Sequence, residues 1–186
     1  LTFQRAGAGA NPIIYSPVGG AQAMFPTGYT NPIDGIFRMI STDYLTIDGI
    51  NLQENAANAA ITVTALSTAA NLAPLMEFGY GFFKADATNG CNNNTIKNCS
   101  ITLNRWNFGF PWGGTGAGST GILMTNQTAT SSTALVVTSV AGTNSNNKFY
   151  TNTIQNVNTG ISMVGFADAS PYTLSDTGND IGGTAV

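Results

Sequence analysis

Three acidic side chains, Asp43, Asp48 and Glu54, lie close enough in the sequence to suggest acid–base chemistry. Enzymes that cleave polysaccharides use two or three acids that converge on one groove, or calcium-binding acids beside a basic residue. Asp48 precedes a glycine, a pair typical of a turn, and the other two acids lie in expected loops. We therefore predict no catalytic residues, with a catalytic cluster of these three acids as the alternative.

An aromatic segment is the second candidate for chemistry, because both tryptophans of the chain fall within residues 105–112. Aromatic faces beside polar side chains suit stacking on sugar rings. The competing interpretation is that these rings pack against the flank of the fold, since exposed apolar patches are costly. The candidate ligand-binding residues are Arg105, Trp106, Phe108 and Trp112.

Several other kinds of site are excluded by residue content. The chain has no histidine, which excludes Ser-His-Asp catalysis and histidine-ligated zinc. Cys91 and Cys99 cannot complete a four-thiolate metal site, so we predict neither a metal nor a cofactor. These cysteines form either a disulfide or two inward-facing free thiols. The net charge of −3 shows no excess of basic residues of the kind that binds nucleic-acid phosphates.

The composition indicates a β protein. Only 8% of the 186 residues are charged, against about 25% in a typical domain. Thr, Gly and Asn are abundant (25, 22 and 21 residues), and these residues form strands and turns rather than helices. The length suits one domain, and we expect no membrane insertion.

Two families of segments recur in the same order. One begins with glycine and continues with apolar residues, and the other contains a Thr-Ile pair followed by a turn residue. Their period of two indicates strands, and the recurring circuit of three short strands predicts a parallel β-helix over residues 1–186. An antiparallel β-sandwich with long loops is the alternative. The glycine segments begin at Gly35, Gly81, Gly121 and Gly160, and the Thr-Ile segments contain Ile47, Ile96 and Ile154.

The same repeats predict which residues stack on one another. Ile47, Ile96 and Ile154 should form one inward column, and Ile50, Ile101 and Ile161 another. Asp48, Asn98 and Asn156 should occupy equivalent corners. Insertions at 54–77 and 104–120 should leave from the same corner, after the second strand of the circuit. Insertions that leave from one corner lie side by side, so they should form a shared binding surface. Further insertions are expected at 127–146 and 166–178.

Residues 147–161 and 91–103, both built around Asn-Thr-Ile-x-Asn, resemble right-handed parallel β-helix repeats. Together with residues 3–12, they are similar to large secreted surface proteins of Gram-negative bacteria that use type IX export. The resemblance covers roughly residues 1–15, 33–52 and 79–165. It implies a fragment of a longer repeat protein on the cell surface.

We accordingly expect a non-enzymatic structural or adhesive module, a stiff extracellular β-solenoid that presents loops. Its expected partners are other segments of the same long chain, cell-surface proteins and polysaccharide. The alternative is a polysaccharide-binding or polysaccharide-degrading protein of the same fold, because the β-helix also hosts lyases and hydrolases.

Overall fold

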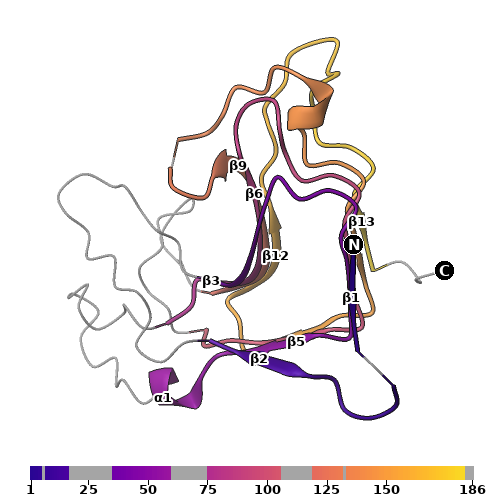
Figure 1. Ribbon diagram of the computed structural model, residues 1–186. Helices are drawn as coiled ribbons and strands as arrows, with labels where there is room; N and C mark the ends of the chain where they lie inside the picture. The colour runs from indigo at the N-terminus through magenta and orange to yellow at the C-terminus, as the bar shows by residue number, and fades with distance from the viewer. Residues whose placement is uncertain (6, 17–34, 60–74, 106–118, 132, 183–186) are drawn as a thin grey trace, which may run out of the picture.

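The chain coils through three parallel β-sheets, which form the three sides of a solenoid (Figure 1). The computed structural model describes residues 1–5, 7–16, 35–59, 75–105, 119–131 and 133–182. We call one circuit through the three sheets a rung. The first sheet contains β1 (Thr2–Gln4), β4 (Thr46–Asp48), β7 (Thr95–Lys97), β10 (Lys148–Tyr150) and β13 (Asp180–Ile181).

The other two sheets have one strand in each of the first four rungs. The second sheet contains β2 (Ile13–Tyr15), β5 (Asn51–Gln53), β8 (Ser100–Thr102) and β11 (Thr153–Gln155). The third sheet contains β3 (Gly35–Ile40), β6 (Phe78–Lys84), β9 (Thr120–Thr128) and β12 (Thr159–Met163). Helical structure in the described residues is limited to α1 (Ala56–Ala59) and the 3₁₀ turn η2 (Val140–Gly142).

Every pair of named strands in the described residues is parallel, which confirms the predicted parallel solenoid. The alternative of an antiparallel sandwich is wrong for the same reason. Each strand therefore bonds to the strand one rung before it and the strand one rung after it, rather than to its neighbour in sequence. Three-residue strands suffice because the partner strands supply the backbone hydrogen bonds.

Inward side chains form apolar columns along each sheet. Ile47 and Ile96 stack as predicted, but Phe149 follows them, and Ile154 lies in the second sheet beside Ile101. Ile161 lies in the third sheet beside Ile122. The first predicted column was wrong at Ile154 because a Thr-Ile pair occurs in both the first and the second sheet. The second was wrong at Ile161, and also at Ile50, since Leu52 lies level with Ile101. The observed columns are Phe3, Ile47, Ile96, Phe149 and Ile181; Ile14, Leu52, Ile101 and Ile154; and Phe37, Tyr80, Ile122 and Ile161.

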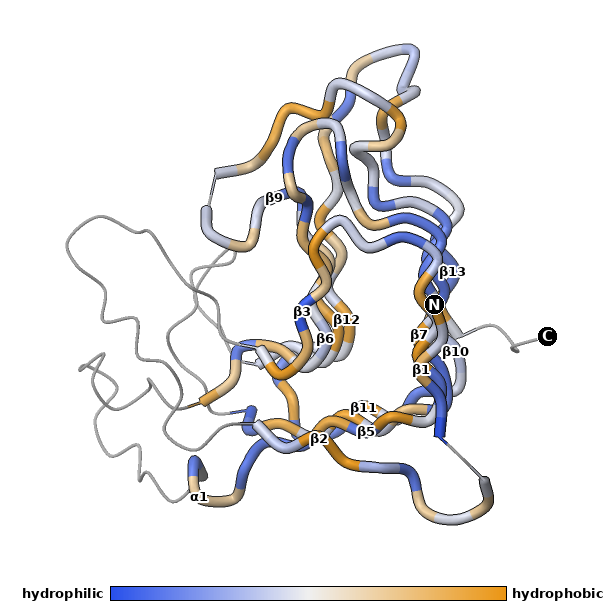
Figure 2. The backbone as a smooth tube through the Cα atoms, in the orientation of Figure 1, coloured by the Kyte–Doolittle hydropathy of each residue, from blue (hydrophilic) through white to orange (hydrophobic). Residues whose placement is uncertain are grey.

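A column of three asparagines, of which Asn94 and Asn147 are fully buried, lies where the chain enters the first sheet. The side-chain Oδ1 of Asn147 accepts from the backbone N–H of Asn94 at 3.0 Å, and Oδ1 of Asn179 accepts from the N–H of Asn147 at 2.9 Å. Oδ1 of Asn94 accepts in turn from the N–H of Leu45, at 3.0 Å. Hydrophilic residues lie above one another at this corner (Figure 2). The column thus continues the ladder of hydrogen bonds around a bend, where backbone pairing alone would stop.

The corner between the first and second sheets uses the left-handed backbone conformation. Gly49, Asn98, Thr151 and Gly182 follow the first-sheet strands there with φ of 71°, 57°, 53° and 77°. The prediction that Asp48, Asn98 and Asn156 share one corner is wrong. Asp48 is the last residue of β4 and accepts from Asn98 Nδ2 at 2.7 Å, whereas Asn156 follows β11 at the next corner.

Glycine is required where the second sheet approaches the third. Gly79 and Gly121 occupy the same place in β6 and β9, and a Cβ on Gly121 would lie 2.4 Å from Ile154 Cγ2. Gly160 occupies this place in β12. The predicted equivalence of Gly35 and Gly81 is wrong, because Gly35 lies level with Phe78, and Gly81 lies level with Arg38. The repeating glycine marks a close approach, not the start of the strand.

Two groups of connections leave the solenoid. Those from the second to the third sheet follow β2, β5 and β8, which confirms the shared corner predicted for 54–77 and 104–120 and adds a third connection. We call this the insertion corner. Those from the third to the first sheet lie over one another at the top of Figure 1, where the predicted insertions 127–146 and 166–178 lie. We call them the loop shelf: residues 41–45, 85–94, 129–147 and 164–179.

Replacing Asn147 tests the asparagine column. Asn147→Ala leaves the buried N–H of Asn94 and the carbonyl of Cys91 without their partners, so we expect a loss of about 2–4 kcal/mol in the free energy of unfolding. Chemical denaturation measures it. Gln155→Ala removes an exposed hydrogen bond to Thr102 and should cost about 0.5 kcal/mol or less. Equal losses in the two variants would contradict the role of the column.

A matched pair of glycine substitutions tests the close approach between the sheets. Gly121→Ala forces a methyl group against Ile154 and the carbonyl oxygen of Gly160, and should destabilise by about 1–3 kcal/mol. Gly160→Ala has the same place in the next strand but no atom within 4 Å of the added Cβ. Its midpoint of thermal unfolding should match the wild type. A tolerated Gly121→Ala would show that the sheets are further apart.

Candidate functional site

One of the predicted ligand-binding residues, Arg105, lies at the insertion corner. Arg105 is exposed and lies just after β8, at the base of the third connection. Trp106, Phe108 and Trp112 lie outside the described residues, so their predicted role stays a prediction. The structure therefore locates the base of the aromatic segment, and this base is held by an acid from the preceding rung.

Glu54 is that acid, and it joins the bases of two connections. Its Oε2 accepts from the backbone N–H of Asn104 at 3.3 Å. Its Oε1 accepts from the N–H of Met76 at 3.1 Å and from Asn58 Nδ2 on α1 at 3.3 Å. Next to this acid, the Oγ of Ser16, which follows β2, accepts from the N–H of Asn55 at 2.8 Å and from Asn58 Nδ2 at 3.1 Å. One buried carboxyl thus joins both ends of the connection after β5 to the base of the connection after β8.

The pKa of Glu54 is raised from 4.5 to about 7. Removal from water is the main cause, because only 7% of the residue is exposed, and the hydrogen bonds from Met76, Asn58 and Asn104 oppose it. Such a carboxyl changes its charge near neutral pH. Its three donors show that it positions the connections, a role that the sequence pattern did not reveal.

The acids of the suggested catalytic cluster do not converge. Asp43 lies on the loop shelf, where its Oδ1 accepts from the N–H of Asn92 at 2.7 Å. Asp48 ends β4 in the first sheet, where its Oδ2 lies 3.5 Å from Lys97 Nζ. Glu54 is at the insertion corner. Among the described residues, no group of three acids, cysteines or histidines could hold a metal ion.

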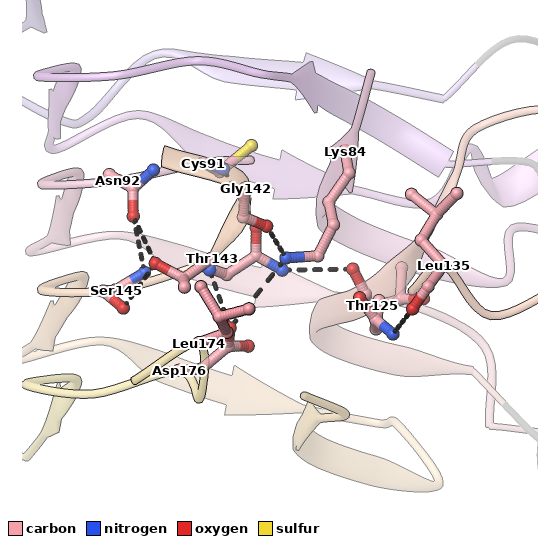
Figure 3. A network of polar contacts seen from close by, with 12 residues as sticks. Lys84, Cys91, Asn92, Thr125, Leu135, Gly142, Thr143, Ser145, Leu174 and Asp176 are labelled. Atoms are coloured by element: carbon pink, nitrogen blue, oxygen red, sulfur yellow. Dashed lines mark hydrogen bonds and ion pairs between the residues drawn. The ribbon is translucent and has the colours of Figure 1, made fainter. Parts of the chain in front are cut away.

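The loop shelf contains a second polar site, built around Lys84 at the end of β6 (Figure 3). Lys84 is fully buried, and its Nζ donates to the carbonyl oxygen of Gly142 and lies 3.9 Å from Asp176 Oδ1. The N–H of Asn144 donates to the same Asp176 oxygen at 2.8 Å. Asn144 also accepts from the N–H of Cys91, so the site joins three levels of the shelf.

Burial shifts both charged groups toward their neutral forms. It lowers the pKa of Lys84 although Asp176 and Cys91 raise it. It raises the pKa of Asp176 although the Asn144 N–H and Lys84 lower it. One signal in the sequence could have indicated this site: Lys84 directly follows the apolar run of β6, in a chain with six basic residues.

The two cysteines are free thiols in the core, so they form no disulfide. Cys91 Sγ lies 3.3 Å from the carbonyl oxygen of Phe83, and Cys99 Sγ lies 3.1 Å from that of Lys97. Burial raises the pKa of Cys91 to about 11 and also raises that of Cys99. Thiols held in the protonated form in this way are poor nucleophiles.

Comparison with known proteins gave no match: no family model, curated protein or solved structure matches the chain. In the ranges that the structure describes, no helix has the length and apolar character needed to cross a membrane.

The pKa of Glu54 predicts how stability depends on pH. The folded state holds this proton more tightly than the unfolded state, so the free energy of unfolding falls as pH rises from about 4.5 to about 7. The decrease due to Glu54 is at most about 3 kcal/mol. Glu54→Gln should remove this part of the pH dependence, as measured by denaturation at several pH values.

Asp86→Asn is the control for that experiment. Asp86 is solvent-exposed, and hydrogen bonds from Thr88 lower its pKa, so it stays charged throughout the range tested. This variant should keep the wild-type slope. A Glu54→Gln variant with the same slope as the wild type would contradict the assigned pKa.

Proposed function

We propose that the chain is a structural module of an extracellular surface protein, a stiff right-handed β-solenoid that presents loops for contact. The right hand is proposed because parallel strands joined by crossover connections follow it in about 98% of cases. The three in-register sheets support a rod-like role, since each added rung extends the same ladders.

The observation that carries this proposal is the apolar surface at both end rungs. In the middle rungs of the first-sheet column, Ile47 and Ile96 are each 1% exposed. In the same column, Phe3 is 47% exposed at one end, and Ile181 is 53% exposed at the other. Further rungs would cover these residues, so we propose other segments of the same long chain as the first partners.

Low charge is consistent with a solenoid stabilised by backbone and amide hydrogen bonds. Two ion pairs join charged side chains that both lie in the described residues, and in one of these pairs both side chains are partly exposed. Such a composition, together with the resemblance to type IX export proteins, is the basis for proposing a location on the cell surface.

The loops of the insertion corner are the proposed contact surface. Glu54 holds Asn104, which directly precedes the segment of Arg105, Trp106, Phe108 and Trp112 in the sequence. We propose that this segment contacts cell-surface proteins or polysaccharide. The separate positions of Asp43, Asp48 and Glu54 weigh against a polysaccharide-degrading enzyme, so we do not propose that activity.

Antibody labelling of cells that make the protein tests the proposed location. Intact cells should label as strongly as permeabilised cells, and external protease should remove the signal. A cytoplasmic protein of the same cells, labelled only after permeabilisation, is the control. Labelling restricted to permeabilised cells would overturn the proposed surface role.

A further inference from the structure

Lys84 and Asp176 form an amine–carboxyl pair that is enclosed by the loop shelf. The Lys84 side chain is 0% exposed and that of Asp176 is 11% exposed, with 3.9 Å between Nζ and Oδ1. Lys84 ends the third-sheet strand of the second rung, whereas Asp176 lies in the connection after the fourth rung. The pair therefore joins segments that are two rungs apart.

Two neighbouring backbone groups orient this pair for a reaction (Figure 3). The carbonyl oxygen of Gly142 accepts a hydrogen bond from Nζ and so fixes the direction of the amine. The N–H of Asn144 donates to Asp176 Oδ1 at 2.8 Å and so polarises the carboxyl group. We propose that Lys84 and Asp176 condense to form an intramolecular isopeptide bond between Nζ and Cγ.

The condensation needs no oxidant, metal or other reactant. The neutral amine attacks Cγ of the protonated Asp176 carboxyl group, and the Asn144 N–H stabilises the negative charge that develops on Oδ1. The nitrogen gives up a proton, the other carboxyl oxygen accepts it, and the C–O bond breaks to release water. The net change is one amine plus one carboxylic acid to one amide plus one water.

Burial favours this reaction in two ways. It lowers the pKa of Lys84 and raises that of Asp176, which increases the share of the neutral forms that react. It also holds the two groups together, which replaces an encounter in solution by an intramolecular step. Asp176 and Cys91 are the titratable groups that act on the Lys84 amine.

The amide product suits this site better than the ion pair. Burial deprives each charge of its hydration, and the amide removes both charges. Its N–H would keep the Gly142 carbonyl as acceptor, and its carbonyl would keep the Asn144 N–H as donor. Both hydrogen bonds of the product are therefore already present.

A second lysine–aspartate pair provides an internal comparison. Lys97 Nζ lies 3.5 Å from Asp48 Oδ2, closer than in the buried pair, but these side chains are 27% and 30% exposed. Water stabilises both charges there, so this pair should remain ionic. The distance between amine and carboxyl therefore does not distinguish the two pairs. Lys84 and Asp176 differ from the other pair in their burial and in their contacts with the Gly142 carbonyl and the Asn144 N–H.

Mass spectrometry of the full chain, folded and then denatured, tests the bond. We expect a mass lower than that of the sequence by one water, and a protease fragment in which the peptides of Lys84 and Asp176 are joined. Trypsin should fail to cleave after Lys84 but should cleave after Lys97. An unchanged mass in folded protein, with cleavage after Lys84, would overturn the proposal.

Three variants assign the loss of water to this pair. Lys84→Arg and Asp176→Ala should restore the full mass, and Lys97→Arg should still show the loss. Because the wild-type measurement decides the matter, a variant that fails to fold does not obscure it. Loss of water in Asp176→Ala would also overturn the proposal. The bond does not depend on the proposed surface role, which antibody labelling tests separately.

Discussion

In-register stacking is the constraint on which this structure depends. Each strand is paired with the strand of the next rung, so an inward residue must fit the residue above it and the residue below it. Apolar columns satisfy this demand inside the sheets. The column of Asn94, Asn147 and Asn179 satisfies it at a bend, because each side chain accepts from the backbone of its neighbour. The glycines at 79 and 121 satisfy it where two sheets nearly touch.

The sequence predicted the parallel solenoid because alternation and recurrence both follow directly from stacking. The assignment of strands to sheets was harder, because a three-residue strand has one inward side chain. Ile96 in the first sheet and Ile154 in the second therefore share the same local pattern. The asparagine column was also missed, since its members are 53 and 32 residues apart and Leu45 takes its place in an earlier rung.

The functional residues were predicted less well, because burial decides their roles and residue type does not reveal burial. Glu54 was considered for catalysis, yet it holds the bases of two connections. Lys84 was not predicted as a functional residue, because a single lysine after an apolar run is a common pattern in protein sequences. In the structure it is enclosed beside Asp176. The cysteines illustrate the same limit: their spacing allowed either a disulfide or free thiols, and in the structure both are free thiols buried in the core.

Thr151 has a practical consequence for protein engineering. At its corner, the equivalent residues Gly49, Asn98 and Gly182 tolerate a left-handed backbone, but a β-branched threonine at φ of 53° does not adopt it readily. This residue stores strain of about 1–3 kcal/mol. Asparagine adopts this conformation more readily, so Thr151→Asn would relieve strain. It would also place at this corner the same residue type as Asn98 in the preceding rung. Position 151 is thus the natural starting point for a more heat-resistant version of the protein.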